Sequence, residues 1–296
     1  MNPNAIECKN LTHYYGKKLV YENLNFHVEQ GTILGLLGKN GTGKTTTINI
    51  LNGFLQPRSG ECLIYGENSQ HLSPQNKSRI GFLIEGHVQY SFMNIHQIEK
   101  FYSRFYPKWD KEPYWELMSK LKVGADQKIS SMSCGQRSQV ALGLILAQDP
   151  DLLILDDFSM GLDPGYRRLF IDYLREYAKA KNKTIFTTSH IIQDMERLID
   201  DVLIMDFNRI LTQRNVHHFI NEFKQFYFEL DNESVDFSDE TFVVNIEKVG
   251  SKLELYTYES ASFIKEFLKK NNIVFRNFKE LKMSLEDAFI GLTGKY

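Results

Sequence analysis

The sequence predicts an α/β fold around a parallel β-sheet, followed by a small α+β unit. Short apolar runs predict buried strands at Ile33–Leu37, Leu152–Leu155 and Thr184–Thr187, and helical patterns and Gly-rich or polar turns lie between them. Residues 166–177 have the spacing of an amphipathic helix, with one face made of Leu169, Phe170, Tyr173, Leu174 and Tyr177. Alternation of strands and helices is typical of a parallel α/β sheet, which we expect over residues 1–222.

Two further regions have residue patterns that differ from that of this predicted core. Residues 87–150 lack strand signals and are rich in helix formers and aromatic residues, which predicts a helical insertion. Residues 223–296 predict a second domain, a small α+β appendage. Its strands are indicated by alternating apolar residues, namely Phe226, Phe228 and Leu230, then Phe242, Val244 and Ile246, then Leu253 and Leu255. Its helices are expected after Ser260, with Phe263, Ile264, Phe267 and Leu268 on one face, and after the capping-box-like Ser284–Asp287.

Composition narrows the class of protein. The chain has 296 residues, of which 42% are apolar and 24% charged, and its formal net charge is −2. Without a basic excess we expect no nucleic-acid partner. The three cysteines, Cys8, Cys62 and Cys134, are far apart in sequence and predict neither a metal cluster nor a disulfide framework. No apolar run approaches the roughly 20 residues that span a bilayer, and the N-terminus lacks a signal pattern. We therefore expect an intracellular chain whose membrane role, if any, depends on a partner.

A phosphate-binding loop is the strongest motif. Gly38–Thr45 fits the pattern G-x-x-x-x-G-K-[ST], after an apolar strand and before a helical stretch at Thr46–Phe54. Glycines let backbone N–H groups point inward at a polyphosphate, and the helix N-terminus adds its positive dipole end. The expected ATP ligands are Gly38, Lys39, Asn40, Gly41, Thr42, Gly43, Lys44, Thr45 and Thr46. In this pattern Lys44 reaches the β- and γ-phosphates and the Thr45 hydroxyl ligates Mg²⁺.

Further motifs follow in a fixed order. An apolar run ends in a carboxylate at Asp156, and the segment Gly161-Leu-Asp163-Pro comes shortly after it. Before that strand stands Ser133-Cys134-Gly135-Gln136, and His190 follows the strand at Thr184–Thr187. With the phosphate loop, this series resembles the ATPase subunits of ATP-binding cassette (ABC) transporters from residue 5 to about residue 215. The resemblance implies a P-loop NTPase fold with ATP and Mg²⁺ as cofactors.

The resemblance also implies roles for individual residues. Asp156 corresponds to the Walker B aspartate that holds Mg²⁺, Asp163 to the D-loop, and His190 to the switch histidine. The 133–136 segment resembles the signature loop, which binds the γ-phosphate of ATP held by a second cassette; Cys134 replaces its commonest first glycine. Tyr15 resembles the aromatic residue that stacks on adenine, although Tyr14 could serve instead.

Two positions depart from the family pattern. Asp157 stands where the family usually has the glutamate that polarises the attacking water, and Phe158 follows in place of proline. Aspartate is one methylene shorter, so we expect intact ATP binding and slow hydrolysis at this site. Glu85 stands where the family usually has the Q-loop glutamine; its carboxylate can still reach Mg²⁺. Both changes fit a heterodimer with one weak ATP site and equally a homodimer with slow turnover.

The resemblance implies that the chain acts as a subunit of a membrane transporter. We expect a peripheral subunit on the cytoplasmic face, paired with a separate transmembrane subunit and a second cassette. The segments Phe105–Asp110 and Ser284–Ile290 resemble parts of ATPases from exporters of peptides, antibiotics and toxins, with phenol-soluble-modulin exporters as one candidate relative. The alternatives are a soluble ABC ATPase and an ATP-sensing regulator with weak hydrolysis.

Overall fold

The structure is a computed structural model that describes residues 3–83, 90–120, 124–159, 161–232, 235–237 and 240–294. Its residues divide into two compact units, Met1–Gln213 and Arg214–Tyr296. The division falls before the boundary expected near residue 222. The reason is helix α8 (Val216–Glu222), whose buried Phe219 stacks on Phe223, which in turn stacks on Tyr256 of the second unit.

The first unit contains two sheets. The larger sheet has the strand order β10-β9-β3-β8-β7-β6, and its pairs β9/β3, β3/β8, β8/β7 and β7/β6 are parallel. These strands are β3 (Ile33–Gly38), β6 (Ile80–Leu83), β7 (Leu152–Asp156), β8 (Thr184–Thr188), β9 (Asp201–Asp206) and β10 (Arg209–Asn215). The expected α/β fold with a parallel core is therefore present, and the three strands predicted from apolar runs are confirmed.

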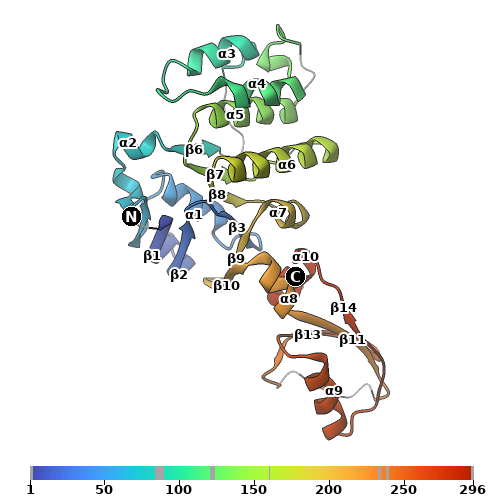
Figure 1. The fold of residues 1–296 in the computed structure, drawn as a ribbon. Helices are drawn as coiled ribbons and strands as arrows, with labels where there is room; N and C mark the ends of the chain where they lie inside the picture. The colour runs from blue at the N-terminus through green and yellow to red at the C-terminus, as the bar shows by residue number, and fades with distance from the viewer. Residues whose placement is uncertain are drawn as a thin grey trace. The chain divides into compact units, whose positions relative to one another are not determined.

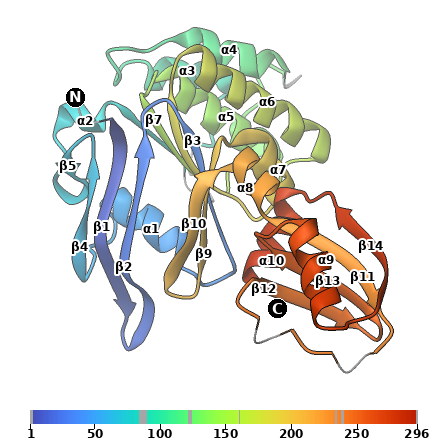
Figure 2. The same ribbon diagram turned by 60° about the horizontal axis from the view of Figure 1, so that its bottom comes forward.

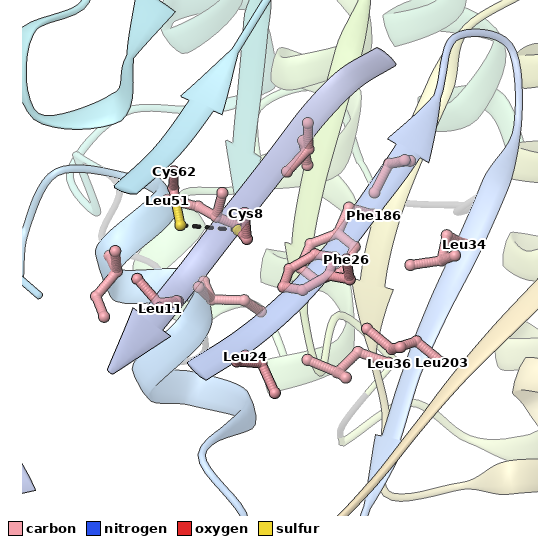
Figure 3. Close-up of a cluster of buried hydrophobic side chains, with 14 of the residues drawn as sticks. Cys8, Leu11, Leu24, Phe26, Leu34, Leu36, Leu51, Cys62, Phe186 and Leu203 are labelled. Atoms are coloured by element: carbon pink, nitrogen blue, oxygen red, sulfur yellow. Dashed lines mark hydrogen bonds between the residues drawn. The ribbon is translucent and has the colours of Figure 1, made fainter. Parts of the chain in front are cut away.

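A smaller antiparallel sheet packs beside the parallel one, in the order β2-β1-β4-β5. Its strands are β1 (Asn4–Tyr15), β2 (Lys18–Glu29), β4 (Ser59–Ile64) and β5 (Glu67–Asn68). The main core lies where side chains of the two sheets and of α1 (Lys44–Leu51) meet. Figure 3 shows Phe26 of β2 stacked on Phe186 of β8, with 5.8 Å between ring centroids. This core fixes the start of α1 against the parallel sheet, where the phosphate loop lies.

Cys8 and Cys62 are neighbours in this core although they are far apart in the sequence. They face each other across the antiparallel pair β1/β4, with 2.8 Å between their sulfur atoms (Figure 3). Both are free thiols and buried, whereas Cys134 is exposed. Sequence separation alone could not predict this contact, because strand pairing brings the two residues together.

Helices cover the parallel sheet and extend beyond its β6 edge. Figure 1 shows α3, α4 and α5 gathered together beyond that edge, and α5 contacts β6. The helices of the first unit are α1, α2 (Pro74–Lys77), α3 (Ile95–Tyr102), α4 (Lys111–Lys120), α5 (Cys134–Ala147), α6 (Pro164–Ala180) and α7 (Ile192–Leu198), with short 3-10 turns at Ser69–His71 and Ile129–Ser131. None of the helices among the described residues is both long enough and apolar enough to cross a membrane.

The buried face of helix α6 differs from the predicted apolar face at one position. Phe170, Tyr173, Leu174 and Tyr177 are buried as predicted, but Leu169 is 36% exposed and Ile171 is buried in its place. The buried stripe of a helix has a finite width, and Leu169 lies at its solvent margin because α7 contacts α6 on the side of Ile171.

The second unit is a four-stranded antiparallel sheet in the order β12-β13-β11-β14. Its elements are α8, β11 (Lys224–Leu230), β12 (Val243–Val249), β13 (Lys252–Thr257), α9 (Ala261–Lys270), β14 (Phe275–Leu281) and α10 (Leu285–Thr293). Helix α9 lies on one face of the sheet (Figure 2), and its Ile264 and Leu268 pack on Phe226 and Phe228. Ser260 and Ser284 cap α9 and α10 as expected.

Strand β12 departs from its expected alternation. A register shift between Val243 and Asn245 interrupts its pairing with β13, and Val244 between them is 39% exposed. An irregularity of this kind moves the following side chains to the opposite face of the sheet. The sequence pattern predicted a regular strand, and the shift leaves Val244 outside the core.

Candidate functional site

A cavity of about 290 Å³ lies at the carboxyl ends of β3, β7 and β8. Its lining includes Tyr15 from β1, the loop and helix start at 40–41 and 43–46, Asp156 and Asp157 at the end of β7, and His190 after β8. In open parallel sheets ligands bind outside the carboxyl ends of the strands, so the place is typical for a nucleotide. The complete lining is Tyr15, Lys18, Val20, Asn40, Gly41, Gly43, Lys44, Thr45, Thr46, Asp156, Asp157, Thr188, Ser189 and His190.

The phosphate loop connects β3 to α1 and is stabilised from within. The Thr42 hydroxyl donates to the carbonyl of Lys39 at 2.9 Å, and Lys44 Nζ donates to the carbonyls of Gly38 at 2.7 Å and Lys39 at 3.1 Å. Gly38, Lys39 and Thr42 thus shape the loop without lining the cavity. Burial lowers the pKa of Lys44, while the nearby Asp156 and Asp157 carboxylates act to raise it.

Gly43 is required at the start of α1. Its φ of 101° lies in the left-handed region, and a Cβ there would come within 2.6 Å of Val20 Cγ1 and 2.7 Å of the Tyr21 ring. Only glycine adopts this conformation and leaves space for both side chains. The glycine therefore lets the loop turn tightly into α1 against the antiparallel sheet.

Two adjacent carboxylates, Asp156 and Asp157, also line the cavity. Asp156 is buried at the end of β7, and its Oδ1 accepts a 2.5 Å hydrogen bond from the Thr188 hydroxyl. Burial raises the pKa of Asp156; the Thr188 hydrogen bond acts to lower it, and the Asp157 charge acts to raise it. Asp156 and Thr45 both line the cavity, and oxygen donors of these kinds suit a hard divalent cation.

Asp157 is held in an unusual backbone conformation that directs it at His190. Its φ is 47°, in the left-handed region, where aspartate is one of the few non-glycine residues found. Its Oδ1 lies 3.4 Å from the His190 backbone nitrogen, which donates to it, and its Oδ2 lies 3.5 Å from His190 Nε2. The Asp157 side chain is 6% exposed and that of His190 is 58% exposed. The structure thus brings these two candidate catalytic residues together at the cavity.

Tyr15 also lines the cavity and is 51% exposed. Its hydroxyl lies 3.4 Å from the Thr46 hydroxyl at the start of α1, and its ring makes an edge contact with His13. Tyr14 does not line the cavity. Of the two tyrosines, Tyr15 therefore offers an aromatic face beside the phosphate loop.

The signature-like residues lie elsewhere in the first unit. Ser133 caps α5 in a reciprocal capping box with Gln136, at 3.1 Å and 3.0 Å, and Cys134 and Gly135 follow in the first turn. Gly135 and Cys134 contact the segment at Gly161–Leu162, and the exposed Asp163 begins α6. None of Ser133, Cys134, Gly135, Gln136 and Asp163 is in the lining of the cavity. Glu85 lies outside the described residues.

The sequence analysis missed four lining residues: Lys18, Val20, Thr188 and Ser189. Thr188 carries the clearest signal, because it ends a strand that runs parallel to β7 and pairs with Asp156 in register. The predicted strand stopped one residue earlier, at Thr187, so this polar strand end was not considered.

The sequence is similar to those of known ATP-binding proteins. Residues 21–159 match the sequence model of a family described as ABC transporter. The Nod factor export ATP-binding protein I of Burkholderia lata is 31% identical over 221 residues, which cover 73% of this chain and 72% of that protein. The bacitracin transport ATP-binding protein BcrA of Bacillus licheniformis is 28% identical over 98% of this chain and 97% of its own length.

Solved structures share the fold. The ATP-binding subunit of an ABC transporter superposes with a TM-score of 0.64 at 24% identity, over 73% of this chain and 92% of that one. A bacterial Atm1-family ABC exporter with ATP bound gives a TM-score of 0.63 at 19% identity, over 74% of this chain and 40% of that one. The chain belongs to the ABC transporter family as an ATP-binding subunit.

Proposed function

We propose that this chain binds Mg-ATP in the cavity beside the phosphate loop and acts as the ATP-hydrolysing motor of an exporter. The observation that carries the proposal is the convergence of Lys44, Asp156 and His190 on one cavity. These residues come from three separate segments, and each supplies a different function toward a triphosphate. Relatives named for Nod factor export and bacitracin transport support the export direction and a peptide-like or antibiotic-like cargo.

In the proposed complex each residue has one task. Tyr15 stacks on the adenine, the backbone N–H groups of the loop surround the phosphates, and Lys44 exchanges its loop carbonyls for phosphate oxygens. Charge-assisted hydrogen bonds to phosphate are stronger than those to neutral carbonyls, so the exchange is favourable. The Thr45 hydroxyl and the Asp156 carboxylate hold Mg²⁺, with Glu85 as a third candidate ligand.

The donor set fits Mg²⁺. The described residues contain no cluster of three His, Cys, Asp or Glu side chains that could enclose a metal ion. A site with one carboxylate and one hydroxyl is nevertheless what Mg²⁺ uses when phosphate oxygens and water complete its octahedron. When bound, the ion neutralises charge on the β- and γ-phosphates.

Hydrolysis depends on Asp157 and His190. The Asp157 carboxylate lies 3.5 Å from His190 Nε2 and is one methylene shorter than the glutamate usual in the family. We infer that it accepts the proton of the attacking water slowly, while His190 orients that water or the γ-phosphate. ATP binding and slow turnover are then compatible in the same site.

A second cassette completes the site. The signature residues 133–136 of one chain lie away from its own cavity and are proposed to reach the ATP of a partner cassette, with Asp163 at the same interface. The N-terminal end of α5 presents the positive end of a helix dipole, which suits a phosphate. The partner is a second copy of this chain or a related cassette.

A transmembrane subunit is the proposed receiver of the motion. The helical region contains an aromatic cluster made of Tyr90, Phe92, Phe101 and Phe105. Neighbouring rings in this cluster have centroids 5.0–6.1 Å apart. Phe92 and Phe105 are 65% and 64% exposed. Exposed aromatic groups of this kind mark interaction sites. We propose that this cluster receives a cytoplasmic helix of the membrane subunit, so that the chain lies at the cytoplasmic face of the membrane.

Co-purification tests this proposal. The tagged chain is isolated from detergent-solubilised membranes of its host, and a multi-span membrane protein in near-equal amount is the expected companion. Phe92→Ser combined with Phe105→Ser should lose that companion, whereas Val249→Ser, which alters an apolar residue 80% exposed in the second unit, should retain it. Recovery of the unaltered chain without a membrane protein would contradict the exporter proposal and favour a soluble ATP-sensing regulator.

A further inference from the structure

Thr188 contacts both acidic residues of the site. It ends β8, where it pairs in register with Asp156 at the end of the parallel neighbour β7. Its hydroxyl donates to Asp156 Oδ1 at 2.5 Å, and its carbonyl accepts from the Asp157 backbone nitrogen at 3.2 Å. The residue is 2% exposed. One buried threonine therefore restrains the side chain of Asp156 and the main chain of Asp157.

The hydroxyl leaves part of the carboxylate free for a cation. A threonine hydroxyl has one hydrogen, and here it is used on Oδ1 of Asp156. This bond fixes the rotation of the carboxylate about its Cβ–Cγ axis, so that Oδ2 has a defined direction. Partners that orient a metal ligand typically change metal affinity by about 10- to 100-fold when they are removed.

The neighbouring threonine provides a comparison. Thr187 is also buried in β8, but its hydroxyl donates to the carbonyl of Leu155 at 3.0 Å, with the Thr188 carbonyl as a second, longer partner at 3.3 Å. That bond joins two strands and touches neither carboxylate. Loss of the Thr187 hydroxyl and loss of the Thr188 hydroxyl thus remove similar buried groups with different partners.

We propose that Thr188 is a positioning residue that holds the Asp156 carboxylate in the orientation needed to bind Mg²⁺ with the nucleotide. The inference rests on the proposed Mg-ATP site and assigns a new residue to it. Thr188 does not touch the phosphates in this role; it acts through Asp156.

Fluorescent ATP binding separates this role from a structural one. The Kd of a fluorescent ATP analogue is measured with excess MgCl₂ and with EDTA, for Thr188→Val, Thr188→Ser, Thr187→Val and Asp156→Asn. We expect Thr188→Val to raise the Kd about tenfold in MgCl₂ and to leave the Kd in EDTA unchanged. Thr188→Ser keeps the hydroxyl and should bind as the unaltered chain does, as should Thr187→Val.

Three results would overturn the inference in distinguishable ways. If Asp156→Asn weakens binding in MgCl₂ and Thr188→Val does not, Thr188 has no positioning role. Equal weakening by Thr188→Val in MgCl₂ and EDTA would assign the hydroxyl to loop or sheet structure instead. If Asp156→Asn itself leaves the Kd in MgCl₂ unchanged, the proposed Mg²⁺ ligand is wrong, and the role of Thr188 is wrong with it. Thermal unfolding of each variant identifies any that fail to fold.

Discussion

Lys44 Nζ donates to the carbonyl oxygen of Gly38 at 2.7 Å, so the lysine of the phosphate loop is held by the loop that it belongs to. Lys44 Nζ also donates a second hydrogen bond, to the carbonyl oxygen of Lys39 at 3.1 Å. The cation is buried, and its charge is balanced by carbonyl dipoles and the nearby carboxylates. A triphosphate must compete with these carbonyls for the same ammonium group.

Lys44→Met should weaken ATP binding without unfolding the chain. Loss of hydrogen bonds to a charged group costs about 1.5–3 kcal/mol, which corresponds to roughly a 10- to 150-fold rise in Kd. Isothermal titration with Mg-ATP measures the change. Lys17→Met removes an exposed cation that does not line the cavity, and this control should bind normally. Equal loss in both variants would indicate a general effect of positive charge.

Asp157→Glu should speed ATP hydrolysis. The longer side chain extends the carboxylate toward the position of the attacking water, and a displacement of about 1 Å changes rates about a hundredfold. We expect at least a tenfold rise in phosphate release at saturating Mg-ATP. Asp157→Asn is the matched control, because it suits the same left-handed backbone but removes the base; it should bind ATP and turn over more slowly. An unchanged or lower rate for Asp157→Glu would refute the idea that aspartate limits turnover.

Gly43→Ala should destabilise the chain more than Gly41→Ala. Both residues have positive φ, 101° and 83°, so an alanine at either position costs about 1–2 kcal/mol of backbone strain. A Cβ added at Gly43 would also collide with the side chains of Val20 and Tyr21. A Cβ added at Gly41 would have no such neighbour within 4 Å. The collision adds about 1–3 kcal/mol. Urea unfolding of the two variants measures the difference, and equal midpoints would show that the collision is relieved.

Lys181→Met should destabilise the first unit mainly when Asp110 is ionised. Lys181 lies 2.8 Å from Asp110, and this hydrogen bond holds the pKa of Asp110 below its ordinary value. A lowered carboxyl pKa gives stability that is present above the unfolded pKa of about 3.9 and disappears as the pH falls through the folded pKa. We expect a loss of less than about 1 kcal/mol at pH 7, because the pair is partly exposed. Chemical unfolding at pH 7 and below pH 3 tests this, and in an Asp110→Asn background the effect of Lys181→Met should lose most of its pH dependence.

Thiol reactivity should distinguish Cys134 from the core pair. Cys134 is exposed, whereas Cys8 and Cys62 are buried, and burial raises the pKa of the Cys8 thiol well above its usual range. The thiolate is the reactive form, so the buried pair should react slowly with an aromatic disulfide reagent. We expect one thiol to react rapidly in the folded chain and all three in urea. Cys134→Ser should abolish the rapid phase; its persistence would mean that the core opens readily.

Much of the fold could be predicted because local sequence patterns determine many of its strands and helix ends. The strands at β3, β7 and β8 are apolar runs, and the caps at Ser260 and Ser284 are local hydrogen bonds. What failed depends on contacts between distant segments. The exposure of Leu169 is decided by the placement of α7, the shift at Val244 by its pairing strand, and the Cys8–Cys62 contact by the β1/β4 pairing.

The same distinction between local patterns and distant contacts applies to the residues of the site. Lys44 belongs to a continuous motif, so its sequence pattern alone indicates phosphate binding. Thr188 belongs to no such motif, and its contact with Asp156 arises from the order of strands in the sheet. A pattern read along the chain could identify the strand but not the hydroxyl that faces the carboxylate.

The separation of Ser133 from the cavity has a kinetic consequence. Each chain carries one phosphate loop and one signature-like segment, and the residues of that segment do not line the cavity beside the loop. If catalysis needs both, a solution of separate chains hydrolyses ATP only through encounters between two of them. The rate per chain then rises with chain concentration when chains are dilute and levels off once they are paired. A membrane subunit that holds two chains side by side would replace this collisional dependence with a high, constant effective concentration.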